Sequence, residues 1–323
     1  LVAGPIERAT HLLPQIQRKR TFDYNRAVDG LRQILWGLFK KVVIADQCAQ
    51  YANEIFNNSE DYSGNTLVLG AVFFTFQIYG DFSGYSDIAL GTARLFGIDL
   101  LKNFAFPYFS RDIAEFWRRW HISLSSWFRD YLYIPLGGSK GGTWMKVRNT
   151  FIIFLVSGFW HGANWTFIIW GLLNAIYIMP SIIFNTNRNN LNTIAQGRIF
   201  PSFKEFCQIG LTFGLTVFAW IFFRSENLTQ ALSYISKIFS KSLFSKNIFT
   251  TSLYSKGELQ PPILIMVIIC FLIIEWLGRD EQYAIAKLGE SKSTYVRLTF
   301  YYILILSILY LTGSEQQFIY FQF

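Results

Sequence analysis

Residues 150–184 restrict the possible folds more than any other part of the chain, because they are apolar almost throughout. As one straight helix the segment would be about 52 Å long, whereas the hydrocarbon core of a bilayer is about 30 Å thick. We therefore expect it to enter a membrane and to break, tilt steeply or protrude. Gly158, Gly162 and Pro180 are the natural break points.

Other apolar segments predict further membrane spans. Of the 323 residues, 52% are apolar and 15% are charged, against about 25% charged residues in ordinary soluble domains. Lipid tolerates only helices or closed barrels, and the segments lack the alternation of barrel strands. The sequence therefore predicts an all-α, polytopic membrane protein with one domain over residues 1–323. The further spans are expected at 66–79, 206–223, 262–277 and 295–312, with an amphipathic, interfacial or oblique helix over 21–56.

The net charge of +8 indicates a membrane surface as partner. Lys and Arg lie between the apolar runs, as charges that set topology and contact lipid headgroups do, so membrane lipid is favoured over nucleic acid. The opening "LVAGPIER" has no initiator Met and no signal pattern. We expect that earlier helices are missing and that the span count is a minimum.

His161 lies in "SGFWHGANW", where a polar side chain at membrane depth must face the protein interior or an aqueous cavity. On a continuous helix, Ser157 and Asn164 would share its face at i−4 and i+3. Gly158 and Gly162 would allow another helix to approach. The alternative is a histidine that only hydrogen-bonds between packed helices.

His121 lies in "FWRRWHISLSSWFRDY". Treated as one helix, this segment places Trp117, Trp120 and His121 on an apolar face and Arg118 on the opposite face. The arginine face is expected to contact lipid headgroups or a phosphorylated donor such as coenzyme A. The alternative for His121 is a boundary histidine among aromatic rings.

Asp81 and Asp87 lie in "YGDFSGYSD", next to an apolar run. Carboxylates this near a bilayer are expected to pair with a base or to line an aqueous cavity. A helix break capped by Asp and Ser is favoured over a catalytic role. A transporter or channel with both histidines and both aspartates as a relay is an alternative of another class, although no inverted repeats are visible. The histidines lie about 40 residues apart with no ligand spacing, so no metal site is expected.

Five motifs together resemble the membrane-bound O-acyltransferase (MBOAT) superfamily, in the bacterial branch of the alginate O-acetylation protein AlgI and the D-alanyl transfer protein DltB. They are "AGPIER", "YGDFSGYSDIALG", "FWRRWHISLSSWFRDYLYIPLGG", "SGFWHGAN" and the closing "FIYFQF". The resemblance implies a ring of tilted and broken helices around a funnel or tunnel. It also implies a multi-pass protein of the bacterial cytoplasmic membrane.

The resemblance implies that His161 is the catalytic histidine and that His121 is a second catalytic position. The expected reaction is acetyl transfer from cytoplasmic acetyl-CoA, the acyl donor, with no bound cofactor, to an extracytoplasmic polysaccharide. A separate partner of the SGNH, AlgJ, AlgX or DltD kind would complete it, and D-alanyl transfer to teichoic acid is the alternative. The candidate substrate- or tunnel-lining residues are Trp117, Trp120, Arg118, Ser157, Trp160, Asn164, Asp81 and Asp87.

Overall fold

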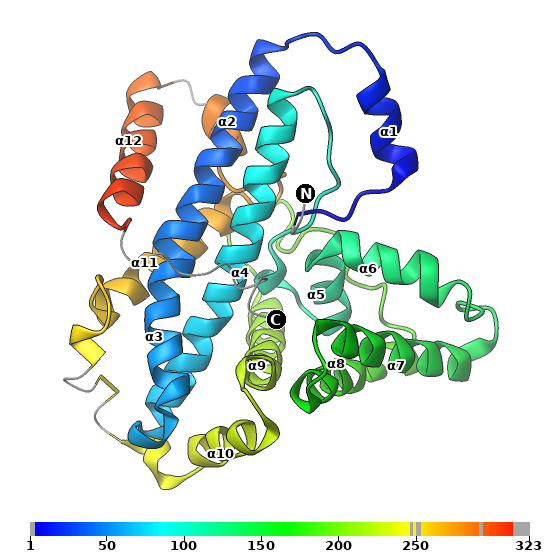
Figure 1. Ribbon diagram of the computed structural model, residues 1–323, viewed down its shortest axis with the longest axis vertical. Coiled ribbons are helices and arrows are strands. Elements are labelled where there is room, and N and C mark those ends of the chain that lie inside the picture. The colour runs from blue at the N-terminus through cyan, green and yellow to red at the C-terminus, as the bar shows by residue number, and fades with distance from the viewer. Residues whose placement is uncertain (1–3, 246–247, 250–252, 291–292, 313–323) are drawn as a thin grey trace.

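The computed structural model describes residues 4–245, 248–249, 253–290 and 293–312. Every regular secondary-structure element in these ranges is a helix or a helical turn (Figure 1). The α-helices are α1 (Ala9–Gln17), α2 (Tyr24–Phe39), α3 (Asp46–Asn57), α4 (Gly64–Leu95), α5 (Ile113–Arg119), α6 (Ile122–Phe128), α7 (Gly142–His161), α8 (Trp165–Ile183), α9 (Phe203–Arg224), α10 (Leu228–Ile238), α11 (Pro261–Leu277) and α12 (Thr294–Tyr310). The π-helical turns are η1 (Lys40–Ala45) and η4 (Arg129–Tyr133), and the 3₁₀ turns are η2 (Ser59–Asp61), η3 (Pro107–Phe109), η5 (Lys241–Phe244), η6 (Leu253–Ser255) and η7 (Ala286–Glu290).

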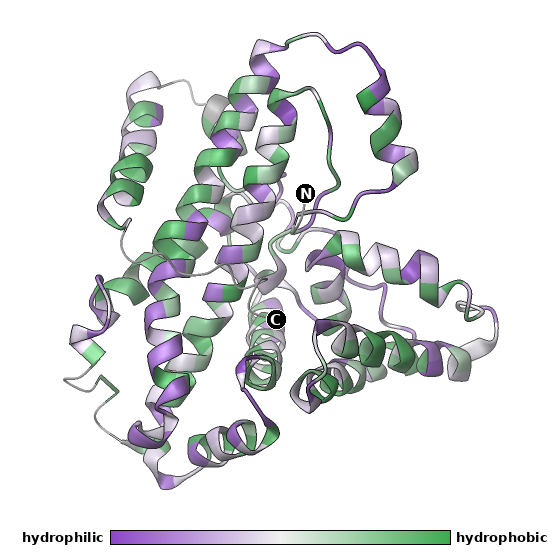
Figure 2. Cartoon of the chain, in the orientation of Figure 1, coloured by the Kyte–Doolittle hydropathy of each residue, from purple (hydrophilic) through white to green (hydrophobic). Residues whose placement is uncertain are grey.

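The predicted all-α membrane fold is confirmed in its main features. Among the described residues, α4, α8 and α9 are long and apolar enough to cross a bilayer. The shorter apolar helices α11 and α12 coincide with two further predicted spans. In Figure 2 most residues of α7, α8, α9 and α11 have the colour of hydrophobic residues, and several connections between helices have that of hydrophilic ones. The predicted docking of the closing segment, "GSEQQFIYFQF", lies outside the described residues.

The long helical pair at the centre of Figure 1 is formed by α4 and by α2, η1 and α3, which continue one another. Glycines set their close approach. A Cβ atom on Gly84 would lie 2.7 Å from the carbonyl oxygen of Gly37, and one on Gly37 would lie 2.6 Å from the carbonyl oxygen of Gly84. Small residues at such a crossing let two backbones touch, as in membrane helix pairs.

The helix break predicted at "YGDFSGYSD" is wrong, because α4 runs without interruption from Gly64 to Leu95. Its glycines serve helix packing and not a turn. Its carboxylates pair with lysines of η1: Asp87 lies 2.5 Å from the Lys40 amine, and Asp81 lies 2.7 Å from that of Lys41. Buried charges are tolerated when they are paired in this way, so the acidic residues need no helix end to accommodate them.

The break predicted in the 150–184 segment is confirmed at Gly162. Helix α7 ends at His161, and α8 begins at Trp165. The backbone of Gly162 is extended (φ 161°, ψ 159°), and the chain reverses into a helical hairpin. Gly158 lies at the crossing, where a Cβ atom would come 2.4 Å from the carbonyl oxygen of Phe167. Pro180 lies within α8 and does not end it.

The continuous helix predicted over "FWRRWHISLSSWFRDY" is wrong. Helix α5 ends at Arg119, and α6 begins at Ile122. Between them His121 adopts a left-handed conformation with φ 45° and ψ 54°. Such a conformation is costly for a residue with a Cβ atom and persists only where surrounding contacts impose it. Here the Ile122 amide donates to the carbonyl of Asn103 (2.9 Å), and the Ala105 amide donates to that of Arg119 (3.0 Å).

Candidate active site

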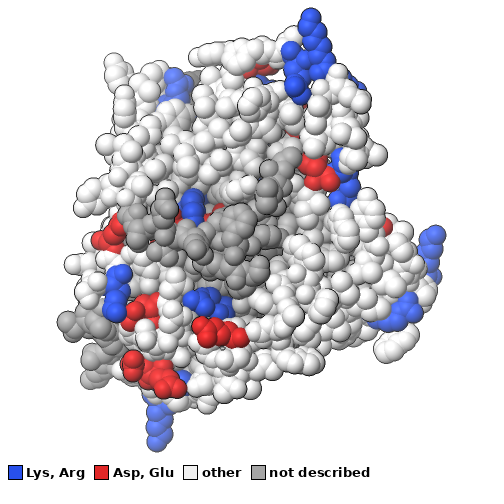
Figure 3. Space-filling model, in the orientation of Figure 1, with Lys and Arg blue, Asp and Glu red and all other residues white. Residues whose placement is uncertain are grey.

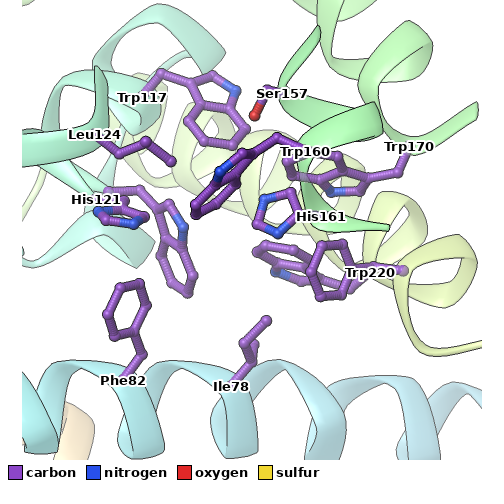
Figure 4. Close-up of a pocket in the computed structure, with 12 residues that line it drawn as sticks. Ile78, Phe82, Trp117, His121, Leu124, Ser157, Trp160, His161, Trp170 and Trp220 are labelled. Carbon is purple, nitrogen blue, oxygen red and sulfur yellow. The ribbon is translucent and has the colours of Figure 1, made fainter. Parts of the chain in front are cut away.

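A cavity of about 250 Å³ opens where six helices meet, and His121 and His161 both lie on its wall (Figure 4). Helix α4 contributes one side, the break between α5 and α6 contributes His121, and α7 contributes His161. Helices α8 and α9 close the remaining side with aromatic rings. In Figure 4 the two imidazoles lie on opposite sides of the cavity, with the Trp160 indole between them in projection. The structure therefore brings together two residues that are 40 positions apart in the sequence.

Stacked and edge-on aromatic rings form most of the wall. Trp170 stacks on Trp220 with ring centroids 5.8 Å apart, and Trp220 in turn contacts Trp120 at 5.3 Å. Trp117 meets Trp170 edge-on at 5.8 Å. Rings packed in this way make a rigid apolar wall, which would exclude water from a reactive group inside.

His161 lies within this aromatic wall at the end of α7. Its ring meets Trp160 at 5.0 Å, Trp170 at 5.2 Å and Phe223 at 5.0 Å, each with the rings steeply inclined. The side chain is only partly buried. Ser157, one turn earlier on the same helix, also lines the cavity and is buried. The i−4 relation predicted for Ser157 and His161 is therefore present.

His121 is almost fully buried, with 4% of its surface exposed. The ring of Phe82 meets it edge-on at 4.6 Å and contacts it from α4. Asn103 fixes its orientation: the Oδ1 atom of Asn103 lies 2.9 Å from Nδ1 of His121. The backbone of Asn103 and Ala105 also forms the hydrogen bonds at the break between α5 and α6. One stretch of chain therefore positions both the backbone and the side chain of His121.

The hydrogen bonds around Asn103 assign the tautomer of His121. The backbone N–H of Ile6 donates to Ser123 Oγ at 2.9 Å, and this hydroxyl donates to Asn103 Oδ1 at 2.9 Å. The amide group Nδ2 of Asn103 donates to Ser86 Oγ at 3.2 Å. Because Oδ1 can only accept, Nδ1 of His121 carries the hydrogen and Nε2 is the basic nitrogen.

A second, smaller cavity of about 150 Å³ adjoins the first. It shares Trp117, His121, Leu124 and Ser157 with the larger cavity and extends toward Arg129 and Tyr133 on η4. His121 thus lies where the two cavities meet, while His161 lines only the larger one.

Half of the residues predicted to line a passage lie on the larger cavity, and the rest do not. Trp117, Trp120, Ser157 and Trp160 are on its wall. Arg118 points elsewhere and donates to the backbone carbonyls of Asn187 (2.6 Å) and Asn190 (2.8 Å) in the loop after α8. Its guanidinium therefore holds this loop.

Asn164 does not share a helical face with His161, because the helix ends between them. It is the N-cap of α8, where its Oδ1 accepts from the Thr166 amide at 3.1 Å. Its Nδ2 donates to the carbonyl of Glu226 at 2.6 Å. These bonds hold Asn164 in the turn between α7 and α8, away from the cavity wall.

Asp81 and Asp87 also lie off the cavity wall, which α4 lines with Ile78 and Phe82 instead. Both carboxylates face the lysines of η1, and Asp87 additionally accepts from Gln33 Nε2 at 2.7 Å. A relay through both histidines and both aspartates, as a transporter would need, is therefore not assembled along this cavity.

Sequence reasoning missed the residues that reach the site from distant segments. Asn103 sits in "LLKNFAF", where neither spacing nor a motif distinguishes it. Trp170, Trp220 and Phe223 belong to runs in which apolar residues occupy every face of the helix, so helical periodicity does not distinguish them. The available signal was weak: a buried polar residue such as Asn103 needs a partner, but the sequence does not name that partner.

The sequence of the chain is similar to those of known proteins. The sequence model of the MBOAT, membrane-bound O-acyltransferase family matches residues 1–223. A probable alginate O-acetylase AlgI of Pseudomonas putida is 36% identical over 289 residues, which are 89% of this chain and 56% of that protein. A peptidoglycan O-acetyltransferase of Helicobacter pylori is 40% identical over 234 residues, 72% of this chain and 43% of that protein.

A teichoic acid D-alanyltransferase of Streptococcus thermophilus is 37% identical over 206 residues, which are 59% of this chain and 49% of that protein. The chain thus spans about half the length of the curated relatives that it matches.

Proposed function

Because the chain belongs to the membrane-bound O-acyltransferase family, we propose that it transfers acetyl groups from cytoplasmic acetyl-CoA across the membrane for O-acetylation of an extracytoplasmic polysaccharide. The observation that carries this proposal is the pair of imidazoles, from α5–α6 and from α7, on the wall of one aromatic cavity. Relatives named as alginate O-acetylase and peptidoglycan O-acetyltransferase support an acetyl group and a glycan acceptor.

In the proposed reaction, His161 is the general base. The oxygen of an acceptor hydroxyl attacks the thioester carbonyl, His161 takes the hydroxyl proton, and the C–S bond breaks as the new C–O ester bond forms. The proton then passes to the departing thiolate, so the thiol of coenzyme A leaves and the imidazole is neutral again. An imidazole suits this step because it is neutral near pH 7, and base catalysis of this kind contributes typically about 10²–10⁴-fold.

His121 is proposed as the second catalytic histidine. With the hydrogen held on Nδ1 by Asn103, its Nε2 can accept a hydrogen bond from an N–H or O–H of either substrate. Its place where the two cavities meet would let it hold the reacting groups together. Ser157, on the same wall, would orient the His161 ring or polarise the thioester carbonyl.

The proposed location is the bacterial cytoplasmic membrane, with several helices crossing it. Transfer to a polysaccharide outside that membrane needs an acceptor protein beyond the bilayer. A partner of the SGNH, AlgJ, AlgX or DltD kind is proposed to receive the acetyl group and complete the modification.

The test compares the three histidines in membrane vesicles supplied with radioactive acetyl-CoA. His161→Ala should abolish labelling of the glycan while the protein remains inserted and abundant, and His121→Ala should reduce it severely. His11→Ala is the matched control, because His11 lies on α1, where its Nδ1 contacts Glu7 at 2.7 Å. Labelling by the His161 variant at the wild-type rate would remove its proposed role.

D-alanyl transfer to teichoic acid is the second candidate, favoured by the 37% identity to a teichoic acid D-alanyltransferase. The same vesicles distinguish the two donors. Under the first proposal, acetyl-CoA alone labels the glycan, whereas a requirement for D-alanine on a carrier-protein thioester would establish the second.

A further inference from the structure

A basic pocket of about 520 Å³ lies at the C-terminal end of α4, whereas the histidine cavity meets the middle of that helix at Ile78 and Phe82, and the two share no lining residue. It forms where the loop between α1 and α2 meets the C-terminal end of α4. Figure 3 shows Lys and Arg side chains gathered at this end of the molecule. The cationic residues that line it are Arg18, Lys19, Arg20, Arg26 and Arg94.

The positive charge of this basic pocket is only partly neutralised by protein groups. Arg26 pairs with Asp99 at 2.5 Å, and Arg94 pairs with Asp29. Arg18, Lys19 and Arg20 have no carboxylate within ion-pair distance among the described residues. Asp23 and Asp99 also line the pocket, so five cations face two carboxylates, and this excess of positive charge favours an anionic ligand.

The rim of the basic pocket is apolar and exposed. Phe22, which is 76% exposed, and Phe96, which is 65% exposed, both line the pocket. Exposed aromatic rings beside cationic side chains are typical of a protein surface at the level of lipid headgroups. The ligand is therefore expected to combine an anionic group with an apolar part.

Helix α1 adds an amphipathic element beside the pocket. Ala9, Leu12, Leu13 and Ile16 follow the i, i+3, i+4, i+7 spacing of one apolar face, yet no residue of α1 is buried by protein. Gln15 binds α1 to the pocket: its Nε2 donates to the carbonyl of Asp99 at 2.9 Å, and its Oε1 accepts from the Asp99 amide at 2.7 Å. A helix of this kind lies in the interfacial plane with its apolar face toward the acyl chains.

We propose that the basic pocket binds the phosphate of an anionic phospholipid, with α1 lying in the headgroup layer beside it. The phosphodiester of the lipid supplies a negative charge to pair with the three cations. The acyl chains of the lipid extend over the exposed apolar rim and α1. The pocket volume is within the range of about 300–1,000 Å³ that holds small-molecule groups. This site is independent of the chemistry proposed for the histidine cavity.

The test measures lipid retention by the purified protein with native mass spectrometry, using phosphatidylglycerol and phosphatidylcholine as probes. The triple variant Arg18→Gln, Lys19→Gln, Arg20→Gln removes the three unpaired cations. The matched control, Lys140→Gln, Lys204→Gln, Lys241→Gln, removes the same charge at exposed positions outside the pocket lining. Each cation near a membrane surface contributes about fivefold in affinity, so the pocket variant should bind phosphatidylglycerol on the order of 100-fold more weakly.

The proposal is supported if wild type and control retain phosphatidylglycerol over phosphatidylcholine and the pocket variant does not. Equal losses in both triple variants would mean a diffuse charge effect and would overturn a discrete site. Equal retention of both lipids would also overturn it. Displacement of the lipid by soluble glycerol phosphate or coenzyme A would show that the pocket serves a soluble phosphate ligand instead.

Discussion

Replacing Asn103 with Leu should slow the proposed acetyl transfer without removing either histidine. Asn103 is fully buried, with 0% of its surface exposed, and its Oδ1 accepts hydrogen bonds from His121 Nδ1 and Ser123 Oγ, each at 2.9 Å. Leucine fills a similar volume but offers no acceptor. The His121 N–H and the Ser123 hydroxyl would then both lose their partner in a buried place.

The expected magnitude follows from the free energy of a buried donor without a partner, which is about 1–3 kcal/mol. His121 can avoid that penalty by moving its hydrogen to Nε2 or by turning its ring. Either change removes the basic nitrogen that the native arrangement provides. If the same free energy enters the activation barrier, kcat falls by roughly 5- to 150-fold. The KM for acetyl-CoA should change little, since the wall of tryptophans is untouched.

The assay is labelled acetyl transfer in vesicles, normalised to folded protein, with kcat and KM determined separately. Ser86→Ala is the first control, because it removes only the partner of Asn103 Nδ2 and should cost less activity. Asn103→Asp is the second, since a carboxylate restores the acceptor and should recover part of the rate. A carboxylate also stabilises a protonated imidazole, so the acid limb of the pH–rate profile should move to higher pH.

Wild-type kcat in the Asn103→Leu protein would refute the positioning argument. So would an equal loss in Ser86→Ala, because the effect would then reflect general loosening of the buried network and not the orientation of His121.

Three further predictions test the fold and the corrected residues. Gly84→Ala should lower the melting temperature, because the added Cβ atom would overlap the backbone of Gly37 and overpacking costs about 1–3 kcal/mol. Gly214→Ala should leave the melting temperature unchanged, because the space around Gly214 is open. Arg118→Lys should leave the KM for acetyl-CoA within twofold of wild type, because Arg118 holds loop carbonyls; a tenfold rise would restore its donor-binding role. Burial lowers the pKa of Lys102 to about 8 from 10.5, so below pH 8 the folded protein carries an unfavourable buried charge. Lys102→Met should therefore raise the melting temperature near pH 7. The gain should vanish toward pH 10.5, where the lysine is neutral in both the folded and the unfolded protein.

Local patterns were sufficient to locate the apolar helices. The apolar runs predict α4, α8, α9, α11 and α12 because a bilayer demands long apolar helices. The 150–184 run had to be interrupted, and of its three candidate break points, Gly158, Gly162 and Pro180, only Gly162 separates two helices. Local patterns failed where a distant partner changed the local preference: the pairing of Asp81 and Asp87 with lysines removed the need for a break in α4, and the contacts of the 103–105 segment imposed one at His121.

By itself, the sequence determined that the chain forms apolar helices and that His121 and His161 are unusual among them. Only the tertiary structure decided that these rings line one cavity, that Trp170 and Trp220 complete its wall, and that Asn103 sets the tautomer of His121. The physical reason is the sequence separation over which each signal extends. Hydropathy and helical periodicity describe a few turns of one helix. A cavity is formed by side chains from helices that are far apart in the sequence and meet only after packing.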